Sequence, residues 1–400
     1  MQDQPGASHQ TTRESRVGQP SKRSEIPSFM VMDVMSAAAK AEAEGRHIIH
    51  MEVGQPGTPA PESARAALAA NLNNEKLGYT LALGMPELRQ RIAQLYGEWY
   101  DVDLSANRIV VTNGSSAAFI LAFLTLFEAG DTVALPSPGY PCYRHILSAL
   151  GQKSRLLETG PATRWMPTLE QLEQCSGEIA GALIASPNNP TGTMLEPERL
   201  SAIAQFCNEQ DIWFISDEIY HGLTFGQPAE TALRYSDNAV IINSFSKYFS
   251  MTGWRVGWMV VPEALVANAE RLAQNLFICA PAPSQLAALA AFEGTDELDR
   301  NRAVYAANRE LLLSELPRVG FPEIVPADGA FYIYADVSAH TNNSLEFTVQ
   351  MLAETGIAAT SGVDFDEARG NRFVRFSYSG RTADVKDAIT RLEAWQRLKT

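Results

Sequence analysis

The chain has 400 residues, 46% of them hydrophobic and 20% charged, which is typical of a globular protein with a large core and two or three domains. The net charge is −14 and the basic residues are scattered, so nucleic acid and anionic membranes are not expected as partners. Because no stretch approaches ~18 consecutive apolar residues, we expect no membrane span.

The N-terminal segment and the cysteines indicate the cellular setting. Residues 1–25 are rich in Gln, Ser, Arg and Gly and lack the apolar centre of a secretory signal, which predicts a flexible tail. The four cysteines lie more than thirty residues apart, which predicts neither a disulfide framework nor a zinc site. We therefore expect a reducing compartment and a cytoplasmic location.

The first predicted elements are helical with one short strand. The apolar pattern predicts a helix over 31–44, a strand over 48–53 that ends in a glycine–proline turn, and helices over 61–71 and 85–98.

Strands and helices then alternate. Strands are predicted at 108–112, 132–135, 180–185, 212–215 and 239–243, and helices at 116–127, 143–150 and 197–209. The later strands are almost continuously apolar, which is typical of a parallel sheet covered by helices on both faces. The pattern therefore predicts an α/β fold with a largely parallel sheet.

The pattern changes after residue 284. A long helical stretch at 285–316 is followed by short strands at 331–336 and 373–378 that alternate with helices. We predict a large α/β domain over residues 61–285 and a smaller α+β domain over 26–60 and 286–400.

Motifs of several other enzyme classes are missing from the sequence. There is no G-x-G-x-x-G, no P-loop and no G-x-S-x-G. The six histidines lack metal-ligand spacing, so no metal is expected.

Lys247 occupies an unusual place for a lysine. It ends the segment 239–247, which is predicted to be a buried strand that runs into the lysine, and it precedes a second apolar, glycine-containing run at 252–258. A buried lysine loses its charge easily and becomes a good nucleophile towards aldehydes. The alternative is a lysine at a strand end that extends to solvent.

Polar residues gather where the predicted strands end. Gly114, Ser115 and Ser116 follow a strand and open a helix, which favours phosphate binding, although a serine there can simply cap the helix. Asp217 follows another strand and needs a donor or cationic partner if buried. Arg255 offers a guanidinium suited to phosphate.

The order of these motifs resembles that of class I and II aminotransferases, which are pyridoxal-5′-phosphate (PLP) enzymes of fold type I. The resemblance covers about residues 26–400. It is carried by Gly54-x-Pro56, Tyr79, Gly84, Leu88-Arg89, Gly114-Ser115, Pro138-x-Tyr140, Asn189-Pro190-x-Gly192, Asp217-x-x-Tyr220, Ser244-x-Ser246-Lys247, Arg255-x-Gly257, Gly329-Ala330-Phe331-Tyr332 and Arg375.

The resemblance implies a mostly parallel seven-stranded sheet, bound PLP and a role for each matching residue. Lys247 forms the internal aldimine and moves the proton between the substrate Cα and the cofactor, and Asp217 pairs with the pyridine nitrogen. Asn189 and Tyr220 bond the phenolic oxygen, and Tyr140 stacks on the ring. The phosphate is held by Gly114, Ser115, Ser116, Ser244, Ser246 and Arg255, and the substrate carboxylate by Arg375, Asn189 and Gly54. Tyr79 reaches the phosphate of a neighbouring subunit, which implies a homodimer.

The implied reaction is ping-pong transfer of an amino group between amino acids and 2-oxo acids. Aspartate-specific relatives carry an added cation, and one branch places a lysine inside the phosphate-binding helix, where this chain has Ser116-Ala117. The expected entry residues are mostly apolar, namely Phe29, Met30, Val53, Gln55 and Phe331, which favours a neutral, aromatic or broad amino donor.

Three alternatives share part of this pattern. A PLP-dependent carbon–sulfur β-lyase has the same fold and nearly the same motifs, and differs in its products. A decarboxylase or acyl-transferring synthase is less favoured by Asn189 and Arg375. A PLP-sensing transcription regulator needs a DNA-binding domain ahead of the fold, for which the 25-residue tail is too short.

Overall fold

The computed structural model describes residues 17–73 and 77–398. The predicted flexible tail, residues 1–25, lies mostly outside this part of the chain. Its described end, residues 17–25, is exposed to solvent and includes the short 3-10 helix η1 (Lys22–Ser24). None of the described helices has the length and apolar character needed to cross a bilayer.

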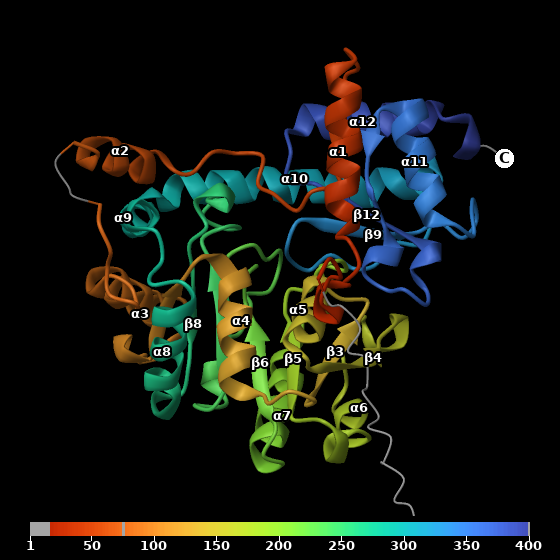
Figure 1. The fold of residues 1–400 in the computed structure, drawn as a ribbon. Helices are drawn as coiled ribbons and strands as arrows, with labels where there is room; N and C mark the ends of the chain where they lie inside the picture. Colours follow the sequence, from red (N-terminus) through yellow and green to blue (C-terminus); the bar gives the residue numbers. More distant parts are fainter. Residues whose placement is uncertain (1–16, 74–76, 399–400) are drawn as a thin grey trace, which may run out of the picture.

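Within the described residues, a seven-stranded sheet with the strand order β2-β8-β7-β6-β5-β3-β4 forms the centre (Figure 1). Its strands are β2 (Ile109–Thr112), β3 (Thr132–Ser137), β4 (Lys153–Glu158), β5 (Gly181–Ala185), β6 (Trp213–Asp217), β7 (Val240–Ser244) and β8 (Gly257–Val260). Only β8 runs against its neighbours, β2 and β7, among the strands described for this sheet. The predicted α/β fold with a mostly parallel sheet is confirmed.

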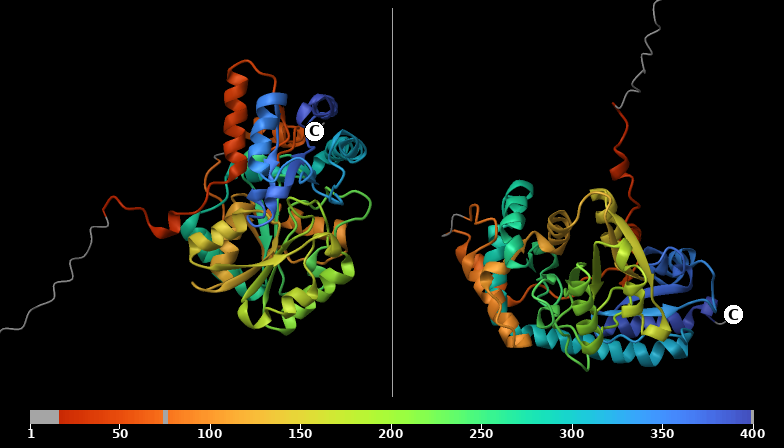
Figure 2. Two further views of the ribbon diagram at one scale, coloured as in Figure 1. Left: turned by 90° about the vertical axis from the view of Figure 1, so that its right-hand side faces the viewer. Right: turned by 90° about the horizontal axis from the view of Figure 1, so that it is seen from below.

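Helices bury both faces of this sheet (Figure 2). Along β7, Val240 and Ile242 belong to one hydrophobic core and Ile241 to the other, because successive side chains of a strand point to opposite faces. The first core includes residues of α4 (Gly114–Leu126), α5 (Cys142–Leu150) and α8 (Val266–Leu276). The second includes residues of α3 (Pro86–Tyr100), α6 (Leu169–Glu173) and α7 (Pro197–Glu209). This two-sided burial explains the almost continuously apolar strands.

The C-terminal part contains a second, antiparallel sheet with the order β11-β12-β9. Its strands are β9 (Tyr332–Asp336), β11 (Thr360–Ser361) and β12 (Phe373–Ser377), and the nearby helices are α11 (Ser344–Thr355) and α12 (Thr382–Ala394). The early chain joins this part, because β1 (Ile49–His50) pairs in parallel with β10 (Ile357–Ala358). Helix α1 (Met30–Ala43) lies beside them (Figure 1).

The predicted helix over 285–316 is wrong in its bounds, because the chain forms α9 (Ala282–Ala291), a short 3-10 turn, and α10 (Thr295–Val319). The turn includes Gly294, where a Cβ would lie 2.6 Å from the Cβ of Pro61. Pro61 directly precedes α2 (Glu62–Asn71), which packs on α9. A glycine therefore permits the close approach of these two segments.

Two strands of the large sheet were not predicted from the sequence. Strand β4 lies at the sheet edge, and Leu157 is its one fully buried residue, so the segment has no apolar run to reveal it. Strand β8 has only four residues and inserts between β2 and β7 from a glycine-containing segment. Strand β4 depends on its backbone hydrogen bonds to β3 more than on its own pattern, whereas β8 is a short apolar run with all four residues buried.

Candidate active site

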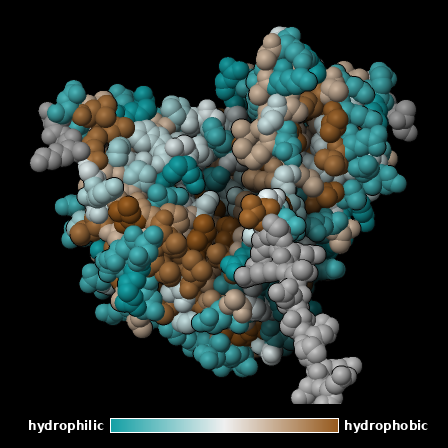
Figure 3. Space-filling view, viewed as in Figure 1, coloured by the Kyte–Doolittle hydropathy of each residue, from teal (hydrophilic) through white to brown (hydrophobic). Residues whose placement is uncertain are grey.

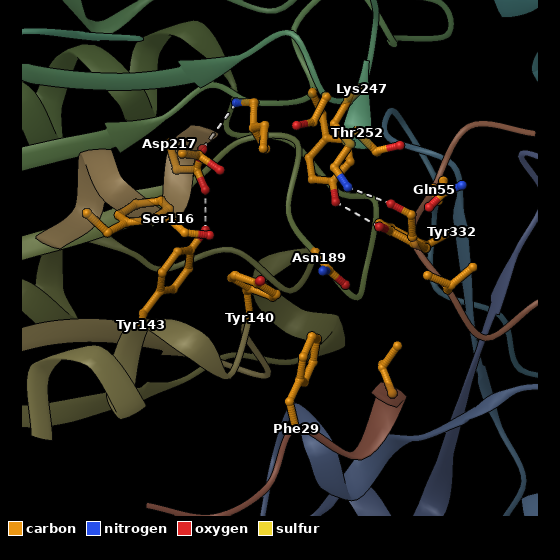
Figure 4. Close-up of a pocket in the computed structure, with 18 of the residues that line it drawn as sticks. Phe29, Gln55, Ser116, Tyr140, Tyr143, Asn189, Asp217, Lys247, Thr252 and Tyr332 are labelled. Atoms are coloured by element: carbon orange, nitrogen blue, oxygen red, sulfur yellow. Dashed lines mark hydrogen bonds between the residues drawn. The ribbon is translucent and has the colours of Figure 1, made fainter. Parts of the chain in front are cut away.

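A cavity of about 220 Å³ lies at the carboxyl ends of the parallel strands, and residues of the C-terminal part complete its wall (Figure 4). Parallel strands end at the same edge of a sheet, which is why residues far apart in sequence meet here. Most of the predicted site residues line this cavity, namely Gly54, Ser115, Ser116, Tyr140, Asn189, Asp217, Tyr220, Ser246, Lys247, Arg255 and Arg375.

Lys247 presents its amine to the cavity. Its Nζ donates a hydrogen bond of 2.5 Å to the backbone oxygen of Gly54, and lies 5.7 Å from the ring centre of Tyr220. Burial and the positive charges of Arg375 and Arg255 lower the pKa of Lys247 to about 7, although Asp217 opposes the shift. Much of this amine is therefore neutral near pH 7, which is the form that attacks an aldehyde.

Asp217 faces the cavity at the end of β6. Its Oδ2 accepts a short hydrogen bond from the Tyr143 hydroxyl, and its Oδ1 accepts one of 3.1 Å from the backbone N–H of Ile219. Burial raises the pKa of Asp217 to about 6, while these two bonds and the charge of Lys247 oppose that rise. A cationic donor within the cavity would favour the ionised carboxylate.

Tyr143 also lines the cavity and was missed by the sequence reasoning. It lies on α5, three residues after Tyr140, and the two ring centres are 5.2 Å apart. Because Tyr140 precedes α5, helical periodicity does not apply to this pair, and no sequence signal identifies Tyr143.

The start of helix α4 forms an anion-binding cradle. Ser115 and Ser116 stand in its first turn, where free backbone N–H groups and the helix dipole favour negative charge. The guanidinium of Arg255 lies directly against this turn, since a Cβ on Gly114 would be 2.4 Å from Nη2 of Arg255. Gly114, with φ of +74°, therefore permits both the backbone conformation and the approach of Arg255.

Three residues predicted for the phosphate site do not line this cavity, namely Ser244, Tyr79 and Gly114, the last of which lies against Arg255. The hydroxyl of Ser244 lies 2.9 Å from Ser246 Oγ and 3.1 Å from the backbone oxygen of Val256, so it stands behind Ser246. Tyr79 is 84% exposed and lies in the loop before α3, outside the cavity of its own chain.

Arg375 is buried on β12 at the wall opposite the large sheet. Its Nη1 donates to Asn189 Oδ1 at 2.8 Å, and its Nη2 donates to the backbone oxygen of Glu52. Because arginine only donates, Asn189 must turn its oxygen towards Arg375 and its NH₂ group away from it. The Nε of Arg375 is buried and has no protein partner in the described structure. A buried donor of this kind is expected to bind an acceptor on a ligand.

Tyr332 completes the wall between Tyr220 and Gly54. The hydroxyls of Tyr332 and Tyr220 are 2.7 Å apart, and a Cβ on Gly54 would lie 1.9 Å from the Tyr332 oxygen. Because the Tyr332 hydroxyl occupies the space that a side chain would need, residue 54 is a glycine and exposes only its backbone to the cavity.

The expectation that Phe331 and Met30 line the entrance is wrong. Phe331 is fully buried and packs against Tyr220, whereas Tyr332, the next residue, lines the cavity. One position along a strand reverses the direction of the side chain. Near Met30, the lining residues are Phe29, Val31 and Met32, because α1 turns Met30 away from the cavity.

Comparison with known proteins agrees with this arrangement. Residues 46–392 match the family model of aminotransferase class I and II. A valine–pyruvate aminotransferase from Mycobacterium tuberculosis is 48% identical over 377 residues, which cover 93% of this chain and 97% of the relative. An aspartate aminotransferase from Thermotoga maritima is 31% identical, over 92% of this chain and 97% of the relative.

Solved structures give the same result. The crystal structure of an aminotransferase from Mycobacterium tuberculosis has a TM-score of 0.92 at 48% identity and covers 94% of this chain and 98% of that chain. The aspartate aminotransferase from Thermus thermophilus with maleate has a TM-score of 0.88 at 27% identity, with 94% and 99% covered. These names favour amino-group transfer over the carbon–sulfur lyase reaction. The chain therefore belongs to the class I and II aminotransferases, PLP-dependent transaminases of fold type I.

Proposed function

We propose that this enzyme transfers amino groups between amino acids and 2-oxo acids by a ping-pong mechanism, with a neutral, aromatic or broad range of donors. The main support for this proposal is that the Lys247 amine, the Asp217 carboxylate and the Arg375 guanidinium all line one cavity. These three groups match the aldehyde, the ring nitrogen and the substrate carboxylate that the reaction brings together.

The chemistry of the donors in the cavity fits PLP. When bound, this cofactor supplies an aldehyde and a ring that accepts electrons. The cradle of Ser115, Ser116 and Arg255 suits its phosphate, with Ser246 beside it and Gly114 and Ser244 in support. Asp217 would pair with the ring nitrogen, and Tyr143 donates a hydrogen bond to that carboxylate. Tyr140 would cover the ring face, and Asn189 and Tyr220 would bind the phenolic oxygen.

Lys247 would be the nucleophile that holds the cofactor aldehyde, and once the substrate amine displaces it, the freed amine would act as the base. Its pKa of about 7 leaves a neutral amine available at working pH. The amine would take the proton from the substrate Cα and give it to the carbon that carried the cofactor aldehyde. Its hydrogen bond to Gly54 holds it beside the wall where the substrate carboxylate binds.

Arg375 binds the α-carboxylate of every substrate in this proposal. Its unpartnered Nε is a buried donor, and Asn189 and the backbone of Gly54 lie beside it. A guanidinium forms two parallel hydrogen bonds with a carboxylate, which fixes the orientation of the amino group.

The rest of the cavity favours an uncharged side chain. Phe29, Val31, Met32, Val53 and Ile219 give it an apolar wall. The cations among its described lining residues are Lys247, Arg255 and Arg375, and the proposal assigns each of them another partner. A second substrate carboxylate would therefore be buried without a cation, which is costly. The relative named for valine and pyruvate supports the same choice.

A homodimer is part of the proposal. Helix α4 is apolar on nearly all sides, and hydrophobic side chains gather over it on the surface (Figure 3). Leu276 at the end of α8 is 49% exposed, and Ile278 just after it is 51% exposed. Such a patch is typical of a subunit interface. Tyr79 from this side then reaches the phosphate site of the second subunit.

Domain division and location complete the proposal. Residues 61–285 form the PLP-binding domain, and residues 26–60 with 286–400 form the smaller one, which the β1–β10 pairing supports. The four free cysteines support a cytoplasmic location.

A half-reaction screen tests the function. The PLP-loaded enzyme is mixed with single amino acids, and the absorbance change of the cofactor is followed without any 2-oxo acid. We expect rapid conversion with neutral and aromatic amino acids and slow conversion with aspartate. Borohydride reduction should then attach the cofactor to the peptide that contains Lys247. Release of pyruvate and ammonia without an acceptor would instead support the lyase, and label on Lys153 would contradict the assignment of Lys247.

A further inference from the structure

We propose that His221 is a positioning residue that sets the distance between Asn189 and Tyr220, the two donors to the phenolic oxygen of the cofactor. The inference rests on the proposed function, because it concerns how these two donors act together. His221 itself does not line the cavity. It acts by joining the two backbone segments that carry the donors.

The imidazole of His221 bridges these segments directly. His221 follows Tyr220 in the turn after β6, and its ring is buried. Its Nε2 lies 2.9 Å from the backbone oxygen of Ser186. Ser186 follows β5 and begins the loop that carries Asn189 three residues later. One hydrogen bond thus connects the turn of Tyr220 with the loop of Asn189.

The partners of the ring determine its protonation. A backbone oxygen only accepts, so Nε2 carries the hydrogen and Nδ1 is the acceptor. The hydroxyl of Tyr100 lies 2.6 Å from Nδ1 and donates to it. Burial lowers the pKa of His221 to about 3, so the ring stays neutral at working pH.

A nearby carboxyl does not change this assignment. Glu218 Oε2 lies 3.6 Å from Nδ1 of His221. Burial raises the pKa of Glu218 to about 8, so at neutral pH mainly two uncharged groups face each other. The Tyr100 hydroxyl therefore remains the hydrogen-bond partner of Nδ1.

Close packing holds the bridge in place. Tyr100 is at the end of α3, and its ring centre is 5.6 Å from that of His221. At the next residue, Gly222, a Cβ would lie 2.7 Å from the Tyr248 ring and 2.9 Å from that of Trp99. This packing fixes the turn of Tyr220, so the hydrogen bond from His221 holds the Ser186 loop at a set distance from that turn.

The bridge has a consequence that a purely structural role lacks. Asn189 and Tyr220 both donate to one oxygen that is negatively charged when deprotonated. Donors to the charged form lower the pKa of the group that they bind, and their strength depends steeply on distance. If the two segments drift apart, both bonds weaken together and the pKa of the bound chromophore rises.

The experiment compares four variants as PLP-loaded enzymes. His221→Leu removes the bridge, and His221→Gln keeps an N–H donor for the Ser186 oxygen. Tyr100→Phe removes the donor to Nδ1. The matched control is Gln152→Leu, which removes two buried hydrogen bonds, to Phe123 and Phe127, at the amino end of β4 and far from the cavity. For each variant we measure the pH midpoint of the cofactor absorbance, the rate of cofactor release and the melting temperature.

We expect His221→Leu to raise the midpoint by about one pH unit and to speed cofactor release. His221→Gln should restore most of the wild-type midpoint, and Tyr100→Phe should shift it upward by less. Gln152→Leu should lower the melting temperature without moving the midpoint.

Unchanged midpoints in His221→Leu and Tyr100→Phe would overturn the proposal, even if both variants melt earlier. If His221→Leu does not fold, an unshifted Tyr100→Phe overturns it alone. If the wild type transaminates normally and the absorbance midpoints of the variants are unchanged, only the role of His221 is rejected and the proposed function stands. A wild type that binds no PLP rejects the proposed function as well.

Discussion

Lys247 and Asp217 have pKa shifts in opposite directions from one physical cause. Burial disfavours the charged form of each group, so the pKa of Lys247 falls to about 7 and that of Asp217 rises to about 6. For Asp217 the hydrogen bond from Tyr143 limits the shift, which makes that hydroxyl a support of the negative charge. The charge state of the site therefore depends on a residue that no motif contains.

Tyr143→Phe tests that support. The substitution removes one hydrogen bond to a charged acceptor, worth roughly 1.5–3 kcal/mol, so turnover should fall about ten- to a hundredfold. Affinity for PLP should change much less, because the phosphate cradle stays intact. The measurements are steady-state kinetics and a PLP titration of the cofactor-free enzyme. The control is Tyr96→Phe, which loses a buried hydroxyl bonded to Trp258 outside the cavity. Equal turnover in both variants would contradict the role of Tyr143.

Arg375→Lys tests the carboxylate site. A lysine cannot reproduce two parallel hydrogen bonds, and the loss of one bond to a charged partner should raise KM by roughly ten- to over a hundredfold. All amino and 2-oxo acids should be affected by similar factors, since all carry the α-carboxylate, and PLP occupancy should hardly change. Kinetics with one neutral, one aromatic and one acidic donor measure this. An effect confined to the acidic donor would make Arg375 a selector of the distal side chain.

At the level of elements, the first turn of α4 and the segment of Arg255 form one unit. Gly114 has no side chain, which allows the Arg255 guanidinium to lie against the turn. The cradle therefore depends on this glycine as much as on Ser115 and Ser116. The helix supplies oriented N–H groups, and the arginine supplies the full charge that they lack.

Gly114→Ala should therefore weaken PLP binding by about tenfold or more, because the new Cβ displaces the Arg255 guanidinium and loses a charge-assisted bond. The matched control is Gly130→Ala. Gly130 also has a positive φ, +99°, but a Cβ there meets no atom of the described structure within 4 Å. Both variants carry backbone strain of roughly 1–2 kcal/mol, and only the first should lose PLP affinity in an equilibrium titration. Equal affinities would show that the cradle tolerates the side chain.

For the whole molecule, the exposed apolar surface near α4 predicts the assembly. Leu276→Glu together with Ile278→Glu should shift the enzyme towards monomers and lower its activity, because charges would be buried in the proposed interface. Leu156→Glu is the control, since Leu156 on β4 at the opposite edge of the sheet is 48% exposed and comparable in size. Sedimentation at several protein concentrations measures the change. A wild type that sediments as a monomer would remove the dimer from the proposal.

The buried Glu218 predicts how stability depends on pH. Its Oε1 accepts three hydrogen bonds while Oε2 has none in the described structure, and burial raises its pKa from 4.5 to about 8. The folded state thus holds a proton that the unfolded state releases, and stability falls as pH rises through this window. The loss is on the order of 5 kcal/mol between about pH 4.5 and pH 8. Glu218→Gln removes the titration, so its melting temperature should fall less steeply over the same pH range. If the melting temperatures of the wild type and of Glu218→Gln depend on pH in the same way, Glu218 is not the group that causes this dependence.

The sequence alone was enough to predict the α/β class and most residues of the cavity. Apolar runs identify buried strands, and polar residues after those runs must meet at one edge of a parallel sheet. Lys247, Asp217 and Asn189 could be placed in this way without coordinates. Arg375 could not, because it reaches Asn189 across 186 positions of the chain, and its role came only from the resemblance.

Only the tertiary structure decided which side chains face the cavity and which hold others in place. Tyr332 lines it while Phe331 is buried, because strand register sets the direction of each side chain. Edge strand β4 forms through backbone bonds to β3, which a local pattern does not encode. The bonds of Tyr143 to Asp217 and of His221 to Ser186 join separate segments, so they exist only after those segments have packed. Local sequence determines burial and strand ends, whereas contacts between distant segments depend on how the whole chain packs.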